Sequence, residues 1–216
     1  MARAERASTL ANATAGIRAR LPMQAHMFVF DAPRLLLAFV LAACVVVVLP
    51  AATAESKLKS SSECAHAHEK PSAGNLPEVR AAVLCLHNRE RSAHGLPPLR
   101  THGKLRRAAQ SHAGDMVEGR FFAHVSRSGA DLVDRILKTG YARGQGWALG
   151  ENIAWGTGNL ATAAEIQRAW MESPGHRANI LAHDFRDIGI GIVVGAPVNA
   201  GGLPSATYTA DFGVRR

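Results

Sequence analysis

Three polar side chains stand in surroundings that suggest a functional site. Glu151 lies in the apolar run GENIAWG, His124 follows two phenylalanines, and His176 lies in WMESPGHRANIL. Two neutral imidazoles can bind a divalent cation such as zinc, and a nearby carboxylate can orient a bound water or accept its proton. The spacing along the chain fits either one shared site or three unrelated positions.

The sequence lacks the common catalytic signatures. It has no H-E-x-x-H, G-x-S-x-G, P-loop or C-x-x-C pattern. Ser126, two residues after His124, is the one hydroxyl that a hydrolase could use as a nucleophile beside the three residues. Capping of the loop before Ser128 is the simpler role for Ser126, and no oxyanion hole can be placed from the sequence.

Apolar residues at helical intervals predict the elements that must position these residues. Helices are expected over four segments: 77–94, 104–119, 131–139 and 162–173. Asp131 and Thr162 are the expected N-caps, and Thr162 forms a capping box with Glu165. His112 lies on the apolar stripe of the second helix, so we expect a core histidine with a hydrogen-bond partner. A further helical turn is expected through Leu181.

After Arg186 the apolar period changes to two, which predicts a strand from residue 188 to residue 194. A loop and a second alternating run, 206–212, complete an antiparallel hairpin, which we expect in one sheet with a strand at 149–155. Helices first and strands late indicate an α+β fold.

The stretch 35–49, LLLAFVLAACVVVVL, has the layout of a secretory signal peptide. It precedes Ala52-Thr53-Ala54, which matches the A-x-A pattern of a cleavage site. A membrane-spanning helix needs about 20 apolar residues, and this stretch is shorter. We expect a leader over 1–54 that contacts the membrane during export, a polar linker over 55–76 and one domain over 77–216.

Two alternatives to a cleaved leader stay open. The stretch can act as an uncleaved membrane anchor, or Cys44 can be lipidated, because the residues that precede it resemble a lipobox. Four valines after Cys44 count against lipidation. A start at Met23 or Met27 would give a leader of more ordinary length.

The charge of the expected mature chain is mildly positive. Removal of residues 1–54 leaves 20 Lys and Arg against 15 Asp and Glu, or about +5 before histidine. This excess favours loose attraction to anionic wall polymers or lipid head groups, and no basic cluster with interleaved aromatics points to nucleic acid. Arg89, Arg91, Arg106 and Arg107 are expected on solvated helix faces.

Two cysteines remain after the leader, and an even pair in an exported protein suggests a disulfide. A bond between Cys64 and Cys85 would tie the polar segment to the first helix of the domain. The rival interpretation, a nucleophilic Cys85, is disfavoured because its neighbours are leucines in a helical pattern.

Five motifs occur in the order found in one known family: SHAGDMVEGRFFAH, GENIAWG, WMESPGHRANIL, IGIGIVV and YTADFG. The chain resembles the CAP (SCP) superfamily, named for cysteine-rich secretory proteins, antigen 5 and plant pathogenesis-related class 1 proteins. The resemblance spans about 78–214 and is greatest to the bacterial secreted branch.

The resemblance implies a three-layer α-β-α sandwich with a central antiparallel sheet. It also implies that Glu151, His124 and His176 share a central cleft, where the two histidines, with Glu151 as a further candidate, would bind a divalent metal such as zinc. The same three residues would be catalytic if the protein is an enzyme.

The sequence departs from the family pattern at two places. Eukaryotic members carry a second cleft glutamate three residues after a helix tryptophan, where this chain has Ser173, and Glu172 comes one position early. One residue turns a helix by about 100°, so the role does not transfer to Glu172. Ala210 replaces a glutamine of the bacterial branch. Asn152 is expected to bond backbone near the cleft.

Two classes of function compete. The resemblance favours a secreted binding module without demonstrated catalysis, whose ligand would be a lipid, a peptide or a cell-wall fragment. The alternative is an extracellular hydrolase, protease-like, that uses the same His and Glu residues. Fold does not establish chemistry.

Overall fold

The computed structural model describes residues 63–144 and 146–215. These residues form a mixed α/β domain whose elements, in chain order, are α2 (Leu76–Ala93), β1 (Arg100–Thr101), α3 (Gly103–Gly119), α4 (Leu132–Thr139), β2 (Trp147–Thr157), η1 (Gly158–Ala161), α5 (Ala163–Glu172), α6 (Pro174–Ile180), β3 (Asp187–Val194) and β4 (Ser205–Arg215). The expected leader lies outside the described residues. No helix within the described ranges is both long and apolar enough to cross a bilayer.

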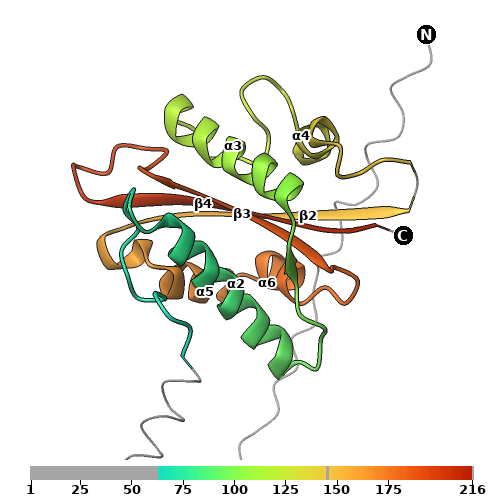
Figure 1. The fold of residues 1–216 in the computed structure, drawn as a ribbon. Coiled ribbons are helices and arrows are strands. Elements are labelled where there is room, and N and C mark those ends of the chain that lie inside the picture. Colours follow the sequence, from blue (N-terminus) through green and yellow to red (C-terminus); the bar gives the residue numbers. More distant parts are fainter. Residues whose placement is uncertain (1–62, 145, 216) are drawn as a thin grey trace, which may run out of the picture. The chain divides into compact units, whose positions relative to one another are not determined.

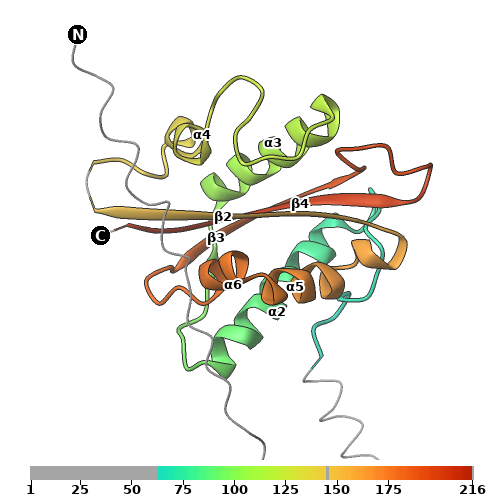
Figure 2. The ribbon, with the colours of Figure 1, turned by 180° about the vertical axis from the view of Figure 1, so that it is seen from behind.

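The four strands form one sheet in the order β1-β3-β4-β2. The β2–β4 and β3–β4 pairs are antiparallel, and the short β1 adds a parallel edge to β3. Helices α3 and α4 lie on one face of the sheet and α2, α5 and α6 lie on the other (Figures 1 and 2). The expected α-β-α sandwich is confirmed, and β2 and β1 are its two edges.

The layers approach closely at α3. A Cβ on Gly189 would lie 2.1 Å from the backbone of Leu105 and Arg106, and one on Gly191 would lie 2.3 Å from the backbone of Ala109. Only glycine at these two strand positions lets the helix backbone lie directly against β3. The alternating glycines therefore serve packing, in agreement with their place inside a strand.

The main core lies between the sheet and the layer of α2, α5 and α6. Its largest fully buried side chains include Trp170, Tyr208 and Phe212. Arg91 is also fully buried there, which makes the expected solvated position wrong. Its guanidinium donates to the carbonyls of Pro97, Ile180, Ala182 and Phe185, so the buried cation has hydrogen-bond partners.

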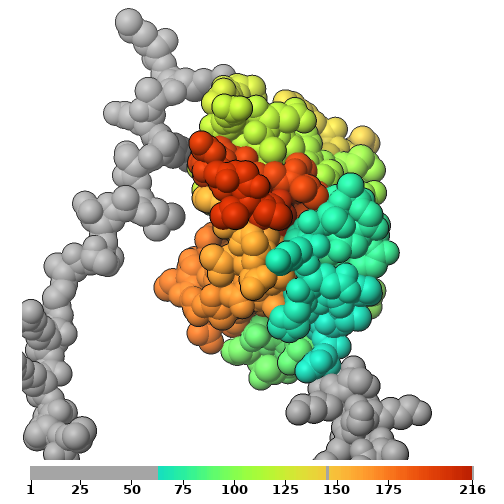
Figure 3. All heavy atoms as spheres, turned by 90° about the vertical axis from the view of Figure 1, so that its left-hand side faces the viewer, coloured from blue at the N-terminus to red at the C-terminus, as the bar shows by residue number. Residues whose placement is uncertain are grey.

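The predicted disulfide is confirmed. Cys64 and Cys85 are bonded, with their Cα atoms 5.7 Å apart, and they join the segment that precedes α2 to the middle of that helix. The carbonyl of Ala67 accepts a hydrogen bond of 2.8 Å from the amide of Ala164 at the start of α5. Figure 3 shows this N-terminal segment in teal against the orange η1–α5 region.

The predicted N-caps are confirmed as well. The Asp131 side chain accepts from the Asp134 amide, and the Thr162 hydroxyl accepts from the Glu165 amide. The capping box predicted for Thr162 and Glu165 is wrong, because the Thr162 amide donates to the Asn159 carbonyl and the Glu165 carboxylate pairs with Arg168. Asp134 also accepts from the backbone of Asp131, which completes a capping box on α4. These caps fix where α4 and α5 begin, one on each side of β2.

Candidate functional site

The candidate site lies at β2, one of the two edges of the sheet. Neighbouring side chains of a strand point to opposite faces, so Glu151 faces the α3–α4 layer while Asn152 faces the α5–α6 layer. Figures 1 and 2 show α4 and α6 on opposite sides of this strand. Groups from both helical layers therefore meet around residues 150–152.

Each residue of the G-E-N motif has its own structural reason. A Cβ on Gly150 would lie 2.8 Å from Oδ1 of Asn179 and 3.0 Å from the ring of Phe185, so glycine lets α6 approach the strand. Asn179 then donates to the backbone carbonyl of Glu151 and to the side-chain oxygen of Asn152. The edge of β2 is thus closed by a side chain from α6.

Asn152 also joins β2 to α6, and it bonds backbone near the cleft as expected. Its side-chain amide donates to the backbone carbonyl of His176 at 2.9 Å, and the side chain is fully buried. A satisfied buried amide fixes α6 against β2. His176 therefore reaches the site through α6 and is half-buried there.

Glu151 and His124 are in direct contact. Nδ1 of His124 lies 2.8 Å from Oε1 of Glu151, although the two residues come from a loop and a strand. The Glu151 side chain is 2% exposed, whereas the His124 side chain is 55% exposed. If Nδ1–H donates to the carboxylate, the Nε2 lone pair of His124 is left on the exposed part of the ring.

Arg135 is a functional residue that the sequence patterns did not predict. Its Nη2 lies 2.6 Å from Oε2 of Glu151, and its Nη1 donates to the carbonyls of His124 and Ala130. One buried guanidinium from α4 therefore holds both the carboxylate and the loop that carries His124. Charge-assisted hydrogen bonds of this kind are stronger than neutral ones.

Glu151 is an ionised and compensated carboxylate. Burial opposes its charge, but the hydrogen bond with His124 and the positive charge of Arg135 outweigh burial and hold the pKa of Glu151 below its usual value. Both oxygens of this carboxylate are engaged. Glu151 is therefore suited to position His124, and its proton affinity is low for a general base.

A second buried carboxyl group, Asp211, lies beside Glu151. The two residues are directly paired across β2 and β4, and Asp211 is fully buried. Burial and then the negative charge of Glu151 raise the pKa of Asp211 well above its usual value. Within the described residues, neither Asp211 oxygen has a hydrogen-bond partner of ordinary geometry. The pair therefore consists of one ionised and one neutral carboxyl group.

His176 completes the trio without touching the carboxylate in the described contacts. Burial lowers the pKa of His176, and the charge of His124 lowers it further, so the two imidazoles are electrostatic neighbours. Both effects favour the neutral form of His176. The structure thus brings His124 and Glu151 into contact and places His176 near His124.

His112 and Ser126 belong to the buried side of this cluster. His112 is fully buried, its Nε2 donates to the carbonyl of Ala123 at 3.0 Å, and its Nδ1 lies 3.4 Å from the Ser126 hydroxyl. Burial lowers the pKa of His112 and Glu151 opposes that shift. The expected core histidine with a hydrogen-bond partner is confirmed. The Ser126 backbone closes the turn to Gly129 and Ala130.

Glu172 lies outside the site. Its carboxylate pairs with Arg168 at 2.8 Å on the exposed surface of α5. Among the residues with described positions, no group of three or more His, Cys, Asp or Glu side chains is arranged to hold a metal ion. The structure therefore lends no support to a metal site with three protein ligands.

The chain matches the model of the cysteine-rich secretory protein family (CAP) over residues 84–210, more than half of its length. Two relatives from Bacillus subtilis strain 168 are the uncharacterized protein YkwD, 37% identical over 111 residues, and the uncharacterized membrane protein YlbC, 36% identical over 110 residues. Each match covers 51% of this chain, and it covers 41% of YkwD and 30% of YlbC. The chain thus spans less than half the length of these curated relatives.

Two solved structures of similar fold come from bacteria. An extracellular protein containing an SCP domain from Bacillus anthracis is 25% identical, with a TM-score of 0.51 over 68% of this chain and 45% of that chain. An outer surface protein from Borrelia burgdorferi is 21% identical, with a TM-score of 0.54 over 69% of this chain and 99% of that chain. The second likeness concerns the fold alone.

Proposed function

Because the chain belongs to the cysteine-rich secretory protein (CAP) family, we propose that it is an extracellular ligand-binding module whose binding surface is the cleft formed by His124, Glu151 and His176. The observation that carries this proposal is the engagement of both Glu151 oxygens, by His124 and by Arg135. A carboxylate that is already paired on both sides orients a ligand-binding imidazole more readily than it moves protons.

The surroundings of His124 suit a ligand that is partly apolar. Phe122 and Val125, its near neighbours in the loop, are 42% and 50% exposed. Exposed apolar side chains beside polar groups are typical of binding surfaces. A lipid, a peptide or a wall fragment each offers such a mixture of apolar and polar groups.

A divalent cation such as zinc fits the cleft only as a weakly held ligand. His124 and His176 would bind it through their neutral imidazoles, and Glu151 would support His124 from behind, because the Glu151 oxygens are engaged. Bound zinc would act as a Lewis acid towards a ligand oxygen. Burial and the charge of His124 lower the pKa of His176, which favours the unprotonated form that binding requires.

The hydrolase alternative lacks a supporting observation. The Ser126 side chain is buried, and its neighbour His112 uses Nε2 to bond the Ala123 carbonyl. A nucleophile must be reachable by its substrate. The buried position of the Ser126 hydroxyl does not meet this condition in the described geometry.

Extracellular location is the second part of the proposal. The expected signal peptide supports it, as does the likeness to a B. anthracis protein described as extracellular. YlbC is described as a membrane protein, so retention in the membrane is the outcome that would replace secretion. N-terminal sequencing of the chain from culture medium should begin at Glu55, and recovery only from the membrane fraction would contradict cleavage.

Calorimetric titration of the full chain with zinc chloride tests the cleft. We expect weak binding at about pH 7.5 that fades at about pH 5.5, since imidazoles must be neutral to bind metal. His124→Ala/His176→Ala should abolish it, and His183→Ala should not, because His183 is an exposed histidine elsewhere on the surface. Unchanged binding in the double variant would reject the cleft as the zinc site.

A further inference from the structure

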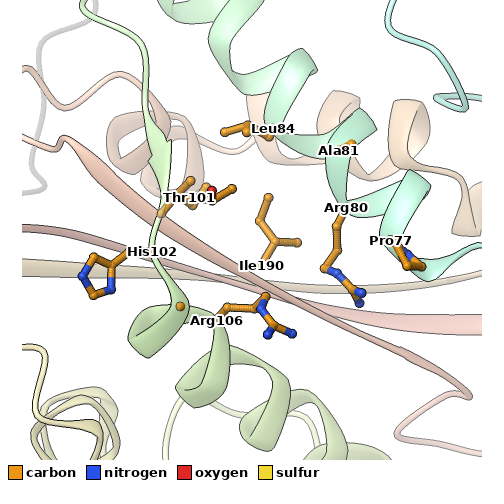
Figure 4. Close-up of a pocket in the computed structure, with 10 residues that line it drawn as sticks. Pro77, Arg80, Ala81, Leu84, Thr101, His102, Arg106 and Ile190 are labelled. Atoms are coloured by element: carbon orange, nitrogen blue, oxygen red, sulfur yellow. The ribbon is translucent and has the colours of Figure 1, made fainter.

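A second concave site lies at the opposite edge of the sheet, where β1 ends. It is a pocket of about 350 Å³ between α2, the start of α3 and β3 (Figure 4). That volume is at the small end of the roughly 300–1,000 Å³ found for ligand sites. Its apolar wall is formed by Pro77, Ala81, Leu84, Ile188 and Ile190.

The row of hydrogen bonds to the outer side of β3 has a gap of one residue at this edge. The His102 amide donates to the Ile188 carbonyl at 2.8 Å, and the chain then turns into α3. Further along β3, the Gln110 side chain bonds both the carbonyl and the amide of Ile192. Residues 188 and 192 thus present their backbone groups to the same edge.

Ile190 stands between these two points of attachment. Backbone groups of a strand alternate between its two sides, so the N–H and C=O of Ile190 point to the same edge as those of Ile188 and Ile192. Within residues 63–144 and 146–215, neither the register of β1 nor the Gln110 bonds extend to Ile190. A ligand amide placed there would complete the edge.

Two like charges flank the same pocket. Arg80 comes from α2 and Arg106 from α3, and Figure 4 shows both head groups on one side of Ile190. Burial lowers the pKa of Arg80, followed by the positive charge of Arg106, and the opposing effect of Glu78 is weaker. Among the described ion pairs, none joins a carboxylate to Arg80 or Arg106. The site therefore favours an anionic ligand.

We propose that this pocket binds the carboxyl terminus of a peptide whose last residue is small and apolar. The terminal carboxylate pairs with Arg80 and Arg106, the last amide bonds the open backbone of Ile190, and the side chain contacts Ala81 and Leu84. A fatty carboxylate is the lesser fit because it would leave the Ile190 backbone groups without a partner. The site is separate from the His124 cleft, so each proposal can fail alone.

The probes are N-acetyl-alanyl-valine as the free acid and the same compound as its amide, titrated into the full chain by calorimetry. We expect the acid to bind at least about tenfold more tightly than the amide, since charge-assisted hydrogen bonds are lost with the carboxylate. Arg80→Gln and Arg106→Gln should each weaken binding of the acid about tenfold. Arg89→Gln is the matched control, an exposed arginine of α2 that does not line the pocket.

Two further measurements guard against a trivial loss of binding. Ala81→Trp fills the pocket from an exposed position on α2 and should abolish binding without lowering the melting temperature. The amide resonance of Ile190 should shift on addition of the acid, and the amide probe should need a concentration at least about tenfold higher for the same shift. Equal affinity for acid and amide, failure of both to bind, or displacement of the peptide by decanoate at lower concentration would each overturn the proposal.

Discussion

At the scale of single residues, the geometry of the site depends more on Arg135 than on the two histidines that would bind a metal. This guanidinium is buried, it compensates Glu151, and it holds the backbone carbonyl of His124 in place. Removing one partner of a buried ion pair leaves an uncompensated charge in a region of low dielectric constant. We therefore expect His124 to lose its position beside Glu151 when Arg135 is replaced.

Arg135→Gln is expected to lower the free energy of unfolding by about 3–5 kcal/mol, since it leaves the Glu151 charge buried without its cation. Urea denaturation followed by circular dichroism measures this change. Glu151→Gln should lower the free energy of unfolding much less in the Arg135→Gln variant than in the unchanged chain, because the double variant has neither charge. Additive effects of the two substitutions would show that the pair is not coupled.

The free energy of unfolding depends on pH through Asp211 with the opposite sign to its dependence through Glu151. Because the folded pKa of Asp211 is raised, folding favours its neutral form, and stability is lost as pH rises from the unfolded pKa towards the folded one. The stability that Asp211→Asn gains over the unchanged chain should therefore grow as the pH rises above about 4, the unfolded pKa of aspartate, by at most about 1.4 kcal/mol per pH unit. Urea titrations at several pH values measure it, and a difference that does not vary with pH would contradict a neutral Asp211.

The two residues that the sequence analysis missed share a physical cause. Arg135 lies on the apolar stripe of α4 with Leu132 and Ile136, and Asp211 lies in a strand that is buried on both faces. A charged residue on an apolar stripe signals a buried partner, but the identity of that partner depends on strand register. The pairing of Glu151 with Asp211 follows only once β2 and β4 are aligned.

At the scale of elements, local patterns predicted most helices and strands. The capped helices α4 and α5 and the alternating strands β3 and β4 appear where period and caps placed them. The two-residue β1 was not expected, because so short a strand has no period. Its parallel pairing with β3 is a tertiary contact that creates the edge beside the Arg80 pocket.

The contact between α6 and β2 depends on Gly150. Gly150→Ala would place a Cβ against Asn179, whose amide is already committed to the Glu151 carbonyl and to Asn152. We expect a loss of about 1–3 kcal/mol in the free energy of unfolding, because neither Asn179 nor the Phe185 ring can move without losing contacts.

Gly114→Ala is the matched control for this substitution. Gly114 lies inside α3 with open space around its Cβ position, so alanine should stabilise the chain by about 0.5–1 kcal/mol. Thermal melts of both variants give the comparison. A Gly150→Ala variant as stable as the unchanged chain would mean that α6 shifts away from β2 freely.

At the scale of the whole molecule, the disulfide joins the N-terminal segment to the helical layer of α2 and α5. Cys64 and Ala67 are buried in the main core, although the surrounding segment is polar in composition. The bond closes a loop with a sequence separation of 21, and the chain-entropy model assigns such a loop about 3 kcal/mol. The bond acts largely by restricting the unfolded chain, so its effect extends beyond the contacts around Cys64.

Cys64→Ala/Cys85→Ala should therefore lower the free energy of unfolding by about 3 kcal/mol, and reduction of the unchanged chain should lower it by a similar amount. The reduced chain should gain the mass of two hydrogens, which checks that the bond was present. The variant should lose no further stability on addition of reductant, since no described residue offers it another disulfide. If reduction leaves the melting temperature unchanged while the mass shift is observed, the N-terminal segment is held by its Ala67–Ala164 hydrogen bond and core packing alone.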